Sequence, residues 1–204
     1  LHNVYFDSDG NGGVIIAGSL GYITGALSFD GKVVKNDTLS NAYDYSYHDI
    51  FVVKIGNTGT VNYAKTFLHS GNENVTYLKS TGDGKLYLCG EYSGSMSILN
   101  KNFPALGNST YYNEFLSCFN AQTGEFVWAE SINTNNYYSE RQRFFNIDKD
   151  NNLYFSTRFS NANVNVFGET YLKRNSSIAC NIIVGKVNNA GQKQWLNVLG
   201  AITT

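Results

Sequence analysis

Several polar residues near the N-terminus have the types and the spacing that metal binding requires. The loop Asp7-Ser8-Asp9-Gly10-Asn11 places oxygen ligands at alternate positions, as a calcium loop does. A loop of the EF-hand type also needs a glutamate at its twelfth position, where this chain has Gly18. Aspartate, asparagine and glycine are equally the residues that a tight turn between two strands requires. We therefore interpret this loop as a turn and predict no metal site.

The chain contains no recognisable catalytic motif. It has no Gly-x-Ser-x-Gly elbow, phosphate-binding loop or Cys-x-x-Cys pair. The histidines His2, His48 and His69 lack the spacing of a shared metal site. Paired carboxylates can hydrolyse sugars, but the spacing selects no pair among Asp44, Asp49, Glu114, Glu125, Glu130 and Glu140. We expect no enzyme activity and no cofactor.

Four Asn-x-Ser/Thr sequons are present, at Asn36, Asn74, Asn108 and Asn175. Asn36, Asn108 and Asn175 each lie 23 positions after the residue that precedes a predicted strand, namely Gly13, Lys85 and Asn152. A shared ancestral polar turn explains this register, and so does a glycan at the same loop of each repeat. On the second interpretation the protein is secreted and carries its sugars on equivalent exposed loops, with Asn74 as a further candidate at the start of a strand.

Charge and composition exclude several classes of protein. The net charge is −1 and no basic cluster occurs, which argues against binding to nucleic acid or to an anionic membrane surface. The longest apolar runs, such as VIIA and IFVV, are too short to span a bilayer. Cys89 and Cys118 fall on predicted strands of one repeat, where either a disulfide or two small core residues would fit.

The elements that must position these residues form a repeat. Residues 50–67, IFVVKIGNTGTVNYAKTF, read as two strands joined by a glycine-bearing turn, and similar stretches return at 114–132 and 182–199. The turn glycines Gly59, Gly124 and Gly191 lie 65 and 67 positions apart, and each precedes a large aromatic residue by four positions. A fixed period of this kind indicates a repeat architecture. The aromatic residues are Tyr63, Trp128 and Trp195.

We divide the chain into three β repeats, at residues 1–71, 72–139 and 140–204. Each contains two short strands around a polar turn, a longer middle segment with its own alternating piece, and the closing hairpin. Four strands per repeat predict one antiparallel propeller blade with a decorated middle connection, and negligible helix. Blades are apolar on both faces because each packs between two neighbours, so we expect the three aromatic residues in the core between blades.

These residues resemble the SBBP-type β-propeller repeats of bacterial surface and secreted proteins. The resemblance rests on Gly10-Asn11 with Val14–Gly18, on Gly84 with Leu86–Gly90, on Asp49–Lys54, and on Gly124 with Trp128. Cys118 departs from it where Lys54 and Lys186 stand, and Tyr63 replaces the tryptophan. The resemblance implies an extracellular, non-catalytic, propeller-like module and carries over no active site.

We therefore expect a structural or assembly module of a cell surface or an extracellular fibre. A glycan- or protein-binding propeller is the first alternative, and a carbohydrate-active enzyme or its accessory domain is the second. The start at Leu1 rather than a methionine leads us to expect a processed chain or a longer parent chain.

The two outer faces of the array indicate which partners the chain has. A closed propeller needs about four to eight blades, so three leave two outer faces bare. We expect these faces to be covered by further repeats of a longer chain, by a second copy that closes a ring, or by copies in a filament. The residues expected on them are Phe51, Val52 and Phe67 at one end and Ile183, Trp195 and Leu199 at the other.

Overall fold

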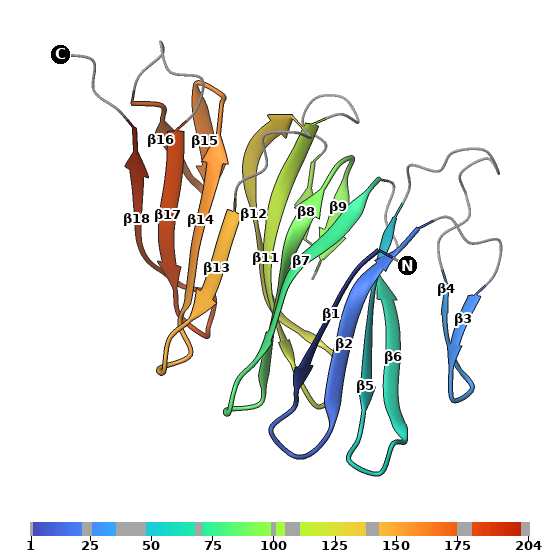
Figure 1. Ribbon diagram of the computed structural model, residues 1–204. Coiled ribbons are helices and arrows are strands. Elements are labelled where there is room, and N and C mark those ends of the chain that lie inside the picture. The colour runs from blue at the N-terminus through green and yellow to red at the C-terminus, as the bar shows by residue number, and fades with distance from the viewer. Residues whose placement is uncertain are drawn as a thin grey trace.

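The computed structural model describes residues 2–21, 26–35, 48–67, 71–98, 101–104, 111–137, 143–174 and 181–200, and all regular structure within them is β. Three four-stranded antiparallel sheets stand side by side, each made from one predicted repeat (Figure 1). The predicted all-β fold with three four-stranded units is thus confirmed, although the described residues do not close into a propeller. No helix among them is long and apolar enough to cross a membrane.

Each sheet has its strands in chain order apart from the middle hairpin. Sheet 1 contains β1 (His2–Ser8), β2 (Val14–Leu20), β5 (Asp49–Ile55) and β6 (Val61–Phe67). Sheet 2 contains β7 (Glu73–Ser80), β8 (Lys85–Tyr92), β11 (Tyr111–Asn120) and β12 (Phe126–Tyr137). Sheet 3 contains β13 (Arg143–Ile147), β14 (Leu153–Phe159), β17 (Asn181–Val187) and β18 (Lys193–Leu199).

A two-stranded hairpin occupies the middle connection of every repeat. The three hairpins are β3 (Ala26–Phe29) with β4 (Lys32–Lys35), β9 (Met96–Ile98) with β10 (Lys101–Phe103), and β15 (Asn163–Val166) with β16 (Glu169–Leu172). Their first strands hold the alternating apolar residues that the sequence shows, such as Val164 and Val166, which are buried. The extra length of each repeat therefore forms a small sheet of its own.

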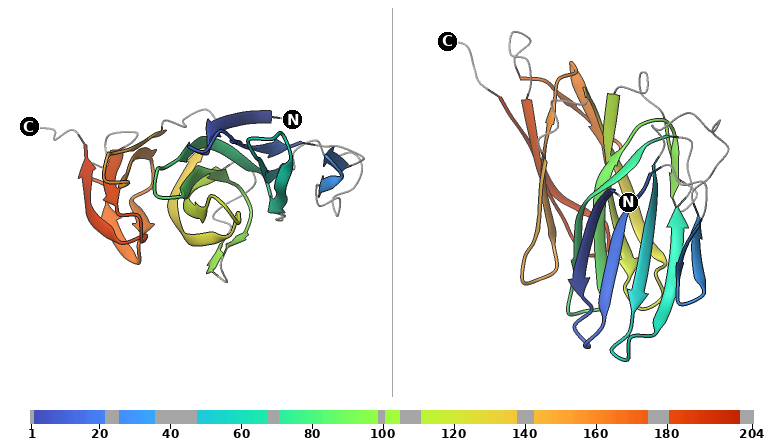
Figure 2. Two further views of the ribbon diagram at one scale, coloured as in Figure 1. Left: turned by 90° about the horizontal axis from the view of Figure 1, so that it is seen from below. Right: turned by 45° about the vertical axis from the view of Figure 1, so that its right-hand side comes forward.

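The sheets pack face against face, as the view from below shows (Figure 2). We call the face that looks toward the following sheet the forward face and the opposite one the rear face. One core cluster joins the forward face of sheet 1 to the rear face of sheet 2, and a second joins sheets 2 and 3 in the same way. Successive side chains of a strand point to opposite faces of the sheet. Where both faces are covered, the side chains on both are apolar, and the strand is a continuous apolar run in the sequence.

The two ends of the array differ from each other, and the expected exposure is wrong for four of the six residues named for them. Phe51 lies on the rear face of sheet 1 but is buried, because Leu27 and Phe29 of the β3–β4 hairpin pack on that face. Val52 and Ile183 are buried too, since they face sheet 2 from either side. At the other end the expected exposure is confirmed for Trp195 and Leu199, which are exposed on the forward face of sheet 3, and is wrong for Ile183. The partly buried Phe67 packs against sheet 2.

Candidate functional site

The Asp7–Asn11 loop is a turn held by an aspartate, as the sequence predicts. Asp9 Oδ1 accepts hydrogen bonds from the backbone amides of Asn11 at 2.9 Å and Gly13 at 2.8 Å. The bond from Asn11 is the largest cause that holds the pKa of Asp9 below its ordinary value. Asp148 makes the same pair of bonds in sheet 3, to Asp150 and Asn152. Among the described residues no group of three or more His, Cys, Asp and Glu side chains is placed to hold a metal ion.

A lysine from the third strand of the sheet binds the second oxygen of this aspartate. Lys54 Nζ lies 3.1 Å from Asp9 Oδ2, and the lysine side chain is almost fully buried. The same nitrogen donates to Gln122 Oε1, in the β11–β12 turn of sheet 2, at 2.7 Å. In sheet 3, Lys186 Nζ lies 3.3 Å from Asp148 Oδ2. The lysine is therefore both a partner of the turn within its sheet and, in sheet 1, a donor to the next sheet.

Sheet 2 lacks both members of this ion pair. Cys118 stands where Lys54 and Lys186 do, and Thr81 stands at the start of the turn in place of the aspartate. Removing one member alone would leave a buried charge without its partner, which is costly. The departure at Cys118 that interrupts the resemblance is thus a paired replacement.

The closing hairpins connect neighbouring sheets through an aromatic residue and a glycine. The Tyr63 ring on β6 packs on Gly124, and a Cβ added to this glycine would lie 2.7 Å from the nearest ring atom. The Tyr63 hydroxyl donates to the Ala121 carbonyl at 3.3 Å. Burial raises the pKa of Tyr63 to about 12. The turn of sheet 2 therefore receives the aromatic residue of sheet 1.

The same contact recurs between sheets 2 and 3. Trp128 on β12 lies over Gly191, with 2.6 Å between a ring atom and the Cβ position, and its Nε1 donates to the Asn189 carbonyl at 3.2 Å. Tyr87 stands beside it, with ring centroids 6.1 Å apart at 68°, and donates to the Asn151 carbonyl at 2.6 Å. Two aromatic residues of the forward face thus use their polar groups on backbone carbonyls of the next sheet.

The forward face of sheet 3 carries the same arrangement, but no further sheet of the described residues packs against it. Tyr154 and Trp195 repeat the pair of sheet 2, with centroids 6.1 Å apart at 66°. Trp195 is 38 % exposed whereas Trp128 is 8 % exposed. Lys186 Nζ lies 4.9 Å from the centroid of the Tyr154 ring. This face presents the groups of an inter-sheet contact to solvent.

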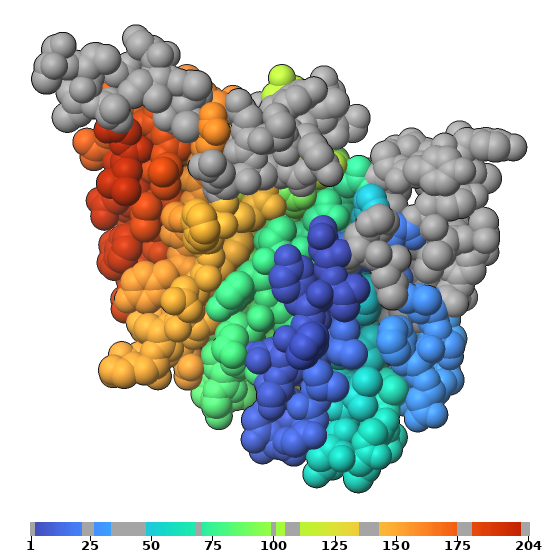
Figure 3. All heavy atoms as spheres, viewed as in Figure 1, coloured from blue at the N-terminus to red at the C-terminus, as the bar shows by residue number. Residues whose placement is uncertain are grey.

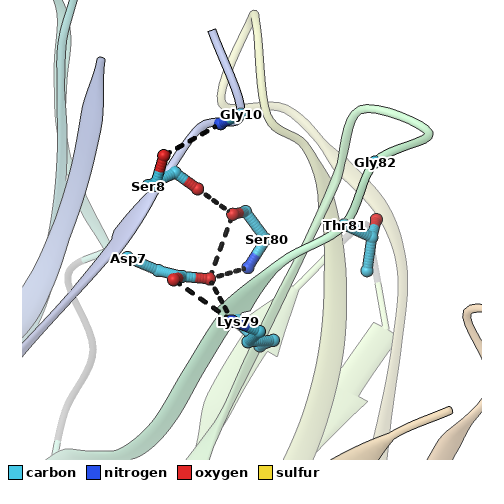
Figure 4. A pocket seen from close by; sticks show the side chains of 7 residues that line it. All are labelled: Asp7, Ser8, Gly10, Lys79, Ser80, Thr81 and Gly82. Atoms are coloured by element: carbon cyan, nitrogen blue, oxygen red, sulfur yellow. Dashed lines mark hydrogen bonds and ion pairs between the residues drawn. The ribbon is translucent and has the colours of Figure 1, made fainter. Parts of the chain in front are cut away.

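A shallow hollow lies between the β1–β2 and β7–β8 turns (Figure 4). Its carboxylate, Asp7, already accepts bonds from the Ser80 amide at 2.7 Å, the Ser80 hydroxyl at 3.0 Å and Lys79 Nζ at 3.2 Å. Partial burial raises the pKa of Asp7, but the bonds from Ser80 and Lys79 outweigh it, so the pKa lies below its ordinary value. The hollow therefore joins sheets 1 and 2, and its carboxylate is occupied by those contacts.

Buried carboxylates gather at the opposite end of sheets 2 and 3. Arg143 bridges Glu91 and Glu114, and Thr157 donates to the same oxygen of Glu114 as Arg143 Nε. Burial raises the pKa of Glu114, and Arg143 opposes that rise. Asn74 donates to Glu91 Oε1 at 3.2 Å. The cluster is an ion-paired link between sheets, and of its members the sequence suggested only Glu114 and Asn74.

The candidate glycosylation sites are placed as follows. Asn36, Asn108 and Asn175 lie outside the described residues. Asn74 lies in β7 with 8 % exposure, and the amide nitrogen that would carry a sugar is the one bonded to Glu91. Of the other carboxylates considered for catalysis, Asp49 is buried, Glu125 and Glu130 lie near or on β12, and Asp44 and Glu140 are outside the described residues.

The two cysteines of sheet 2 are free and buried on its forward face. Cys89 pairs across the strands with Leu116, and Cys118 with Tyr87, so the two are diagonal neighbours. Burial raises the pKa of Cys118 to about 12 and raises that of Cys89 further. Of the two alternatives left by the sequence, the structure shows the small core residues.

No protein-family model matches the chain, and no curated protein was found with significant similarity to it.

Proposed function

We propose that this chain is a non-catalytic structural module of an extracellular surface or fibre, and that the forward face of sheet 3 binds a further sheet of the same repeat type. The observation that carries the proposal is the Tyr154–Trp195 pair. Its ring geometry matches that of Tyr87 and Trp128, which bind the next sheet through two backbone carbonyls. A face built in the same way is suited to the same partner.

The chemistry of the buried polar groups supports a structural role. Glu91 and Glu114 form ion pairs with Arg143, and Asp7 is held by Ser80 and Lys79. These carboxylates link one sheet to the next, and each has at least one oxygen bound by a side chain or backbone group of the neighbouring sheet. A general acid or base would instead need to face a substrate.

The proposal is tested by supplying the missing sheet. A tandem chain, in which residues 1–71 are repeated behind Thr204, offers a fourth sheet to Trp195. We expect a blue shift of the Trp195 fluorescence and a higher denaturation midpoint than in the single chain. Trp128→Phe in both chains leaves Trp195 as the sole tryptophan and assigns the signal. Unchanged fluorescence in the tandem would argue against a docking role for this face.

An extracellular location is the second part of the proposal, and it is supported by the common register of Asn36, Asn108 and Asn175. Expression in a host that glycosylates secreted proteins should add sugar mass to the 22.6 kDa chain. Changing these three residues to Gln should remove that mass, whereas Asn74→Gln serves as the comparison for the buried sequon. A protein secreted without added mass would contradict the glycan part alone.

A further inference from the structure

Exposed apolar side chains concentrate at the two ends of the array. The structure describes nine large hydrophobic residues as exposed, and Phe6 at 77 % and Phe144 at 73 % are the most exposed of them. Strand alternation places Phe6 on the rear face of sheet 1, opposite to Tyr5, and Phe144 on the forward face of sheet 3, opposite to Phe145. Four of the nine lie on the forward face of sheet 3: Phe144, Ile182, Trp195 and Leu199.

These two phenylalanines occupy the positions of a pair that is in contact inside the array. Strand pairing aligns Phe144 with Tyr77 and aligns Phe6 with Phe145. Tyr77 and Phe145 pack against each other between sheets 2 and 3, with ring centroids 5.7 Å apart. Phe144 therefore lacks the rear-face residue that Tyr77 has, and Phe6 lacks the forward-face residue that Phe145 has.

The closing hairpins, at the sheet edge opposite to the first strand, also have one half of a contact at each end of the array. A Cβ at Gly124 or Gly191 would meet an aromatic ring of the preceding sheet, whereas a Cβ at Gly59 would meet no atom of the described residues within 4 Å. The β5–β6 turn that holds Gly59 projects beside the β1–β2 turn at the lower edge of the molecule (Figure 3). Among the described residues, Trp195 has no turn glycine to pack on, and no aromatic ring packs on Gly59.

We propose that the forward face of sheet 3 binds the rear face of sheet 1 in a second copy of this chain, at the part that the β3–β4 hairpin leaves exposed. Phe144 packs against Phe6, and Trp195 lies over Gly59 with its Nε1 donating to the Asn57 carbonyl, which corresponds to that of Asn189. The inference rests on the proposed function and names the partner. A second copy is favoured because both halves of the repeated contact are present on one chain. The contact is head-to-tail, so each copy keeps one free end unless the assembly closes.

Exchange of opposite charges tests the pairing of Phe6 with Phe144. We expect the purified 204-residue chain to associate with rising concentration in sedimentation velocity. Phe6→Lys and Phe144→Asp should each weaken association by about tenfold or more, because each buries a charge in an apolar contact. An equimolar mixture of the two variants should associate again, since it offers one junction with both phenylalanines and one with opposite charges. Leu172→Asp, at an equally exposed residue on β16, should have no effect.

Three results would overturn the inference. The first is a wild-type chain that stays monomeric at all concentrations. The second is a mixture that associates no better than its components. The third is an effect of Phe144→Asp without an effect of Phe6→Lys, which indicates that two sheet 3 faces meet. If the chain is monomeric while the tandem chain covers Trp195, the second copy is the wrong partner but the docking role of the face stands.

Discussion

The indole ring of Trp128 lies on the α-carbon of Gly191 in the next sheet, where a Cβ would come within 2.6 Å of a ring atom. Glycine is therefore required at this position for two reasons. Its φ of +79° is one that L side chains rarely adopt, and the ring leaves no room for a side chain. The turn residue that sets the repeat is also an interface residue.

The two requirements can be separated by comparing Gly191→Ala with Gly59→Ala. Both glycines have a positive φ, at +79° and +82°, so each substitution costs about 1 kcal/mol in backbone strain. Only Gly191→Ala also displaces the Trp128 ring, which adds about 1–3 kcal/mol. Urea denaturation at low protein concentration should show the larger loss for Gly191→Ala. Equal losses would mean that the ring moves aside freely.

Removing the buried lysine should expose the coupling with its aspartate. Lys54→Cys leaves Asp9 without its ion-pair partner in a buried place, and we expect a loss of about 3 kcal/mol. Asp9→Thr in the same chain reproduces the Thr–Cys combination of sheet 2 and should recover part of that loss. A double-mutant cycle on unfolding free energies measures the coupling. Strictly additive losses would argue against a paired replacement.

Acid should weaken the fold through its turn aspartates. The pKa values of Asp7, Asp9 and Asp148 are held below their ordinary value of 3.8 in the folded chain. A group with a depressed pKa stabilises the fold fully above its unfolded pKa and loses that effect as pH falls through the folded one. The unfolding free energy should thus fall steeply below pH 3.8, and less steeply in Asp7→Asn. A parallel fall in this variant would contradict the assignment of Asp7.

Glu73 should act in the opposite direction. Its carboxylate is buried, neither oxygen has a hydrogen-bond partner among the described residues, and burial and then Asp49 raise its pKa well above 4.5. A raised carboxyl pKa favours folding in the protonated form, so stability is lost as pH rises through the folded value. Glu73→Gln should therefore stabilise the chain at pH 7 and have little effect at pH 4.

Glu114→Gln is the matched control for Glu73→Gln. Glu114 is equally buried but accepts bonds from Arg143 and Thr157. Its substitution should destabilise the chain by about 1–3 kcal/mol at pH 7, because a charged hydrogen bond is lost. Urea denaturation of both variants at pH 7 and pH 4 checks the pair of predictions, and a loss for both at pH 7 would show that Glu73 has a structural partner.

The buried thiols should resist modification. Cys89 and Cys118 are enclosed between sheets 2 and 3, and burial raises the pKa of both, so little thiolate forms near neutral pH. We expect labelling by a maleimide reagent to be slow in the folded chain and fast in urea, as mapped by peptide mass spectrometry. Rapid labelling of either residue under native conditions would indicate that the two sheets separate readily.

The repeated sheets could be predicted because their signals are local. Gly59, Gly124 and Gly191 stand in turns that need a positive φ, and the apolar runs beside them belong to strands of sheets that are covered on both faces. Turn chemistry likewise identified the Asp7–Asn11 loop as a turn. These features depend on neighbours within a few residues, which a single sequence displays.

The contacts between sheets could not be predicted in the same way. Nothing in the spacing of Glu91, Glu114 and Arg143 shows that one arginine bridges two sheets. Phe51 was expected on a bare face because the sequence does not reveal that the β3–β4 hairpin folds over it. The ion pair within the sheet could have been predicted, because repeat 2 lacks both the lysine, at Cys118, and the aspartate, at Thr81.

Each sheet is built from one continuous stretch of chain, and this arrangement has a consequence for synthesis. Pairing within a sheet joins neighbouring segments, so the strands of sheet 1 can assemble while sheet 2 is still being translated. Its forward face is covered only when β7, β8 and β11 have left the ribosome and pack on it. The sheets therefore pack in the order in which they are translated, and each folded sheet provides the surface against which the next one packs.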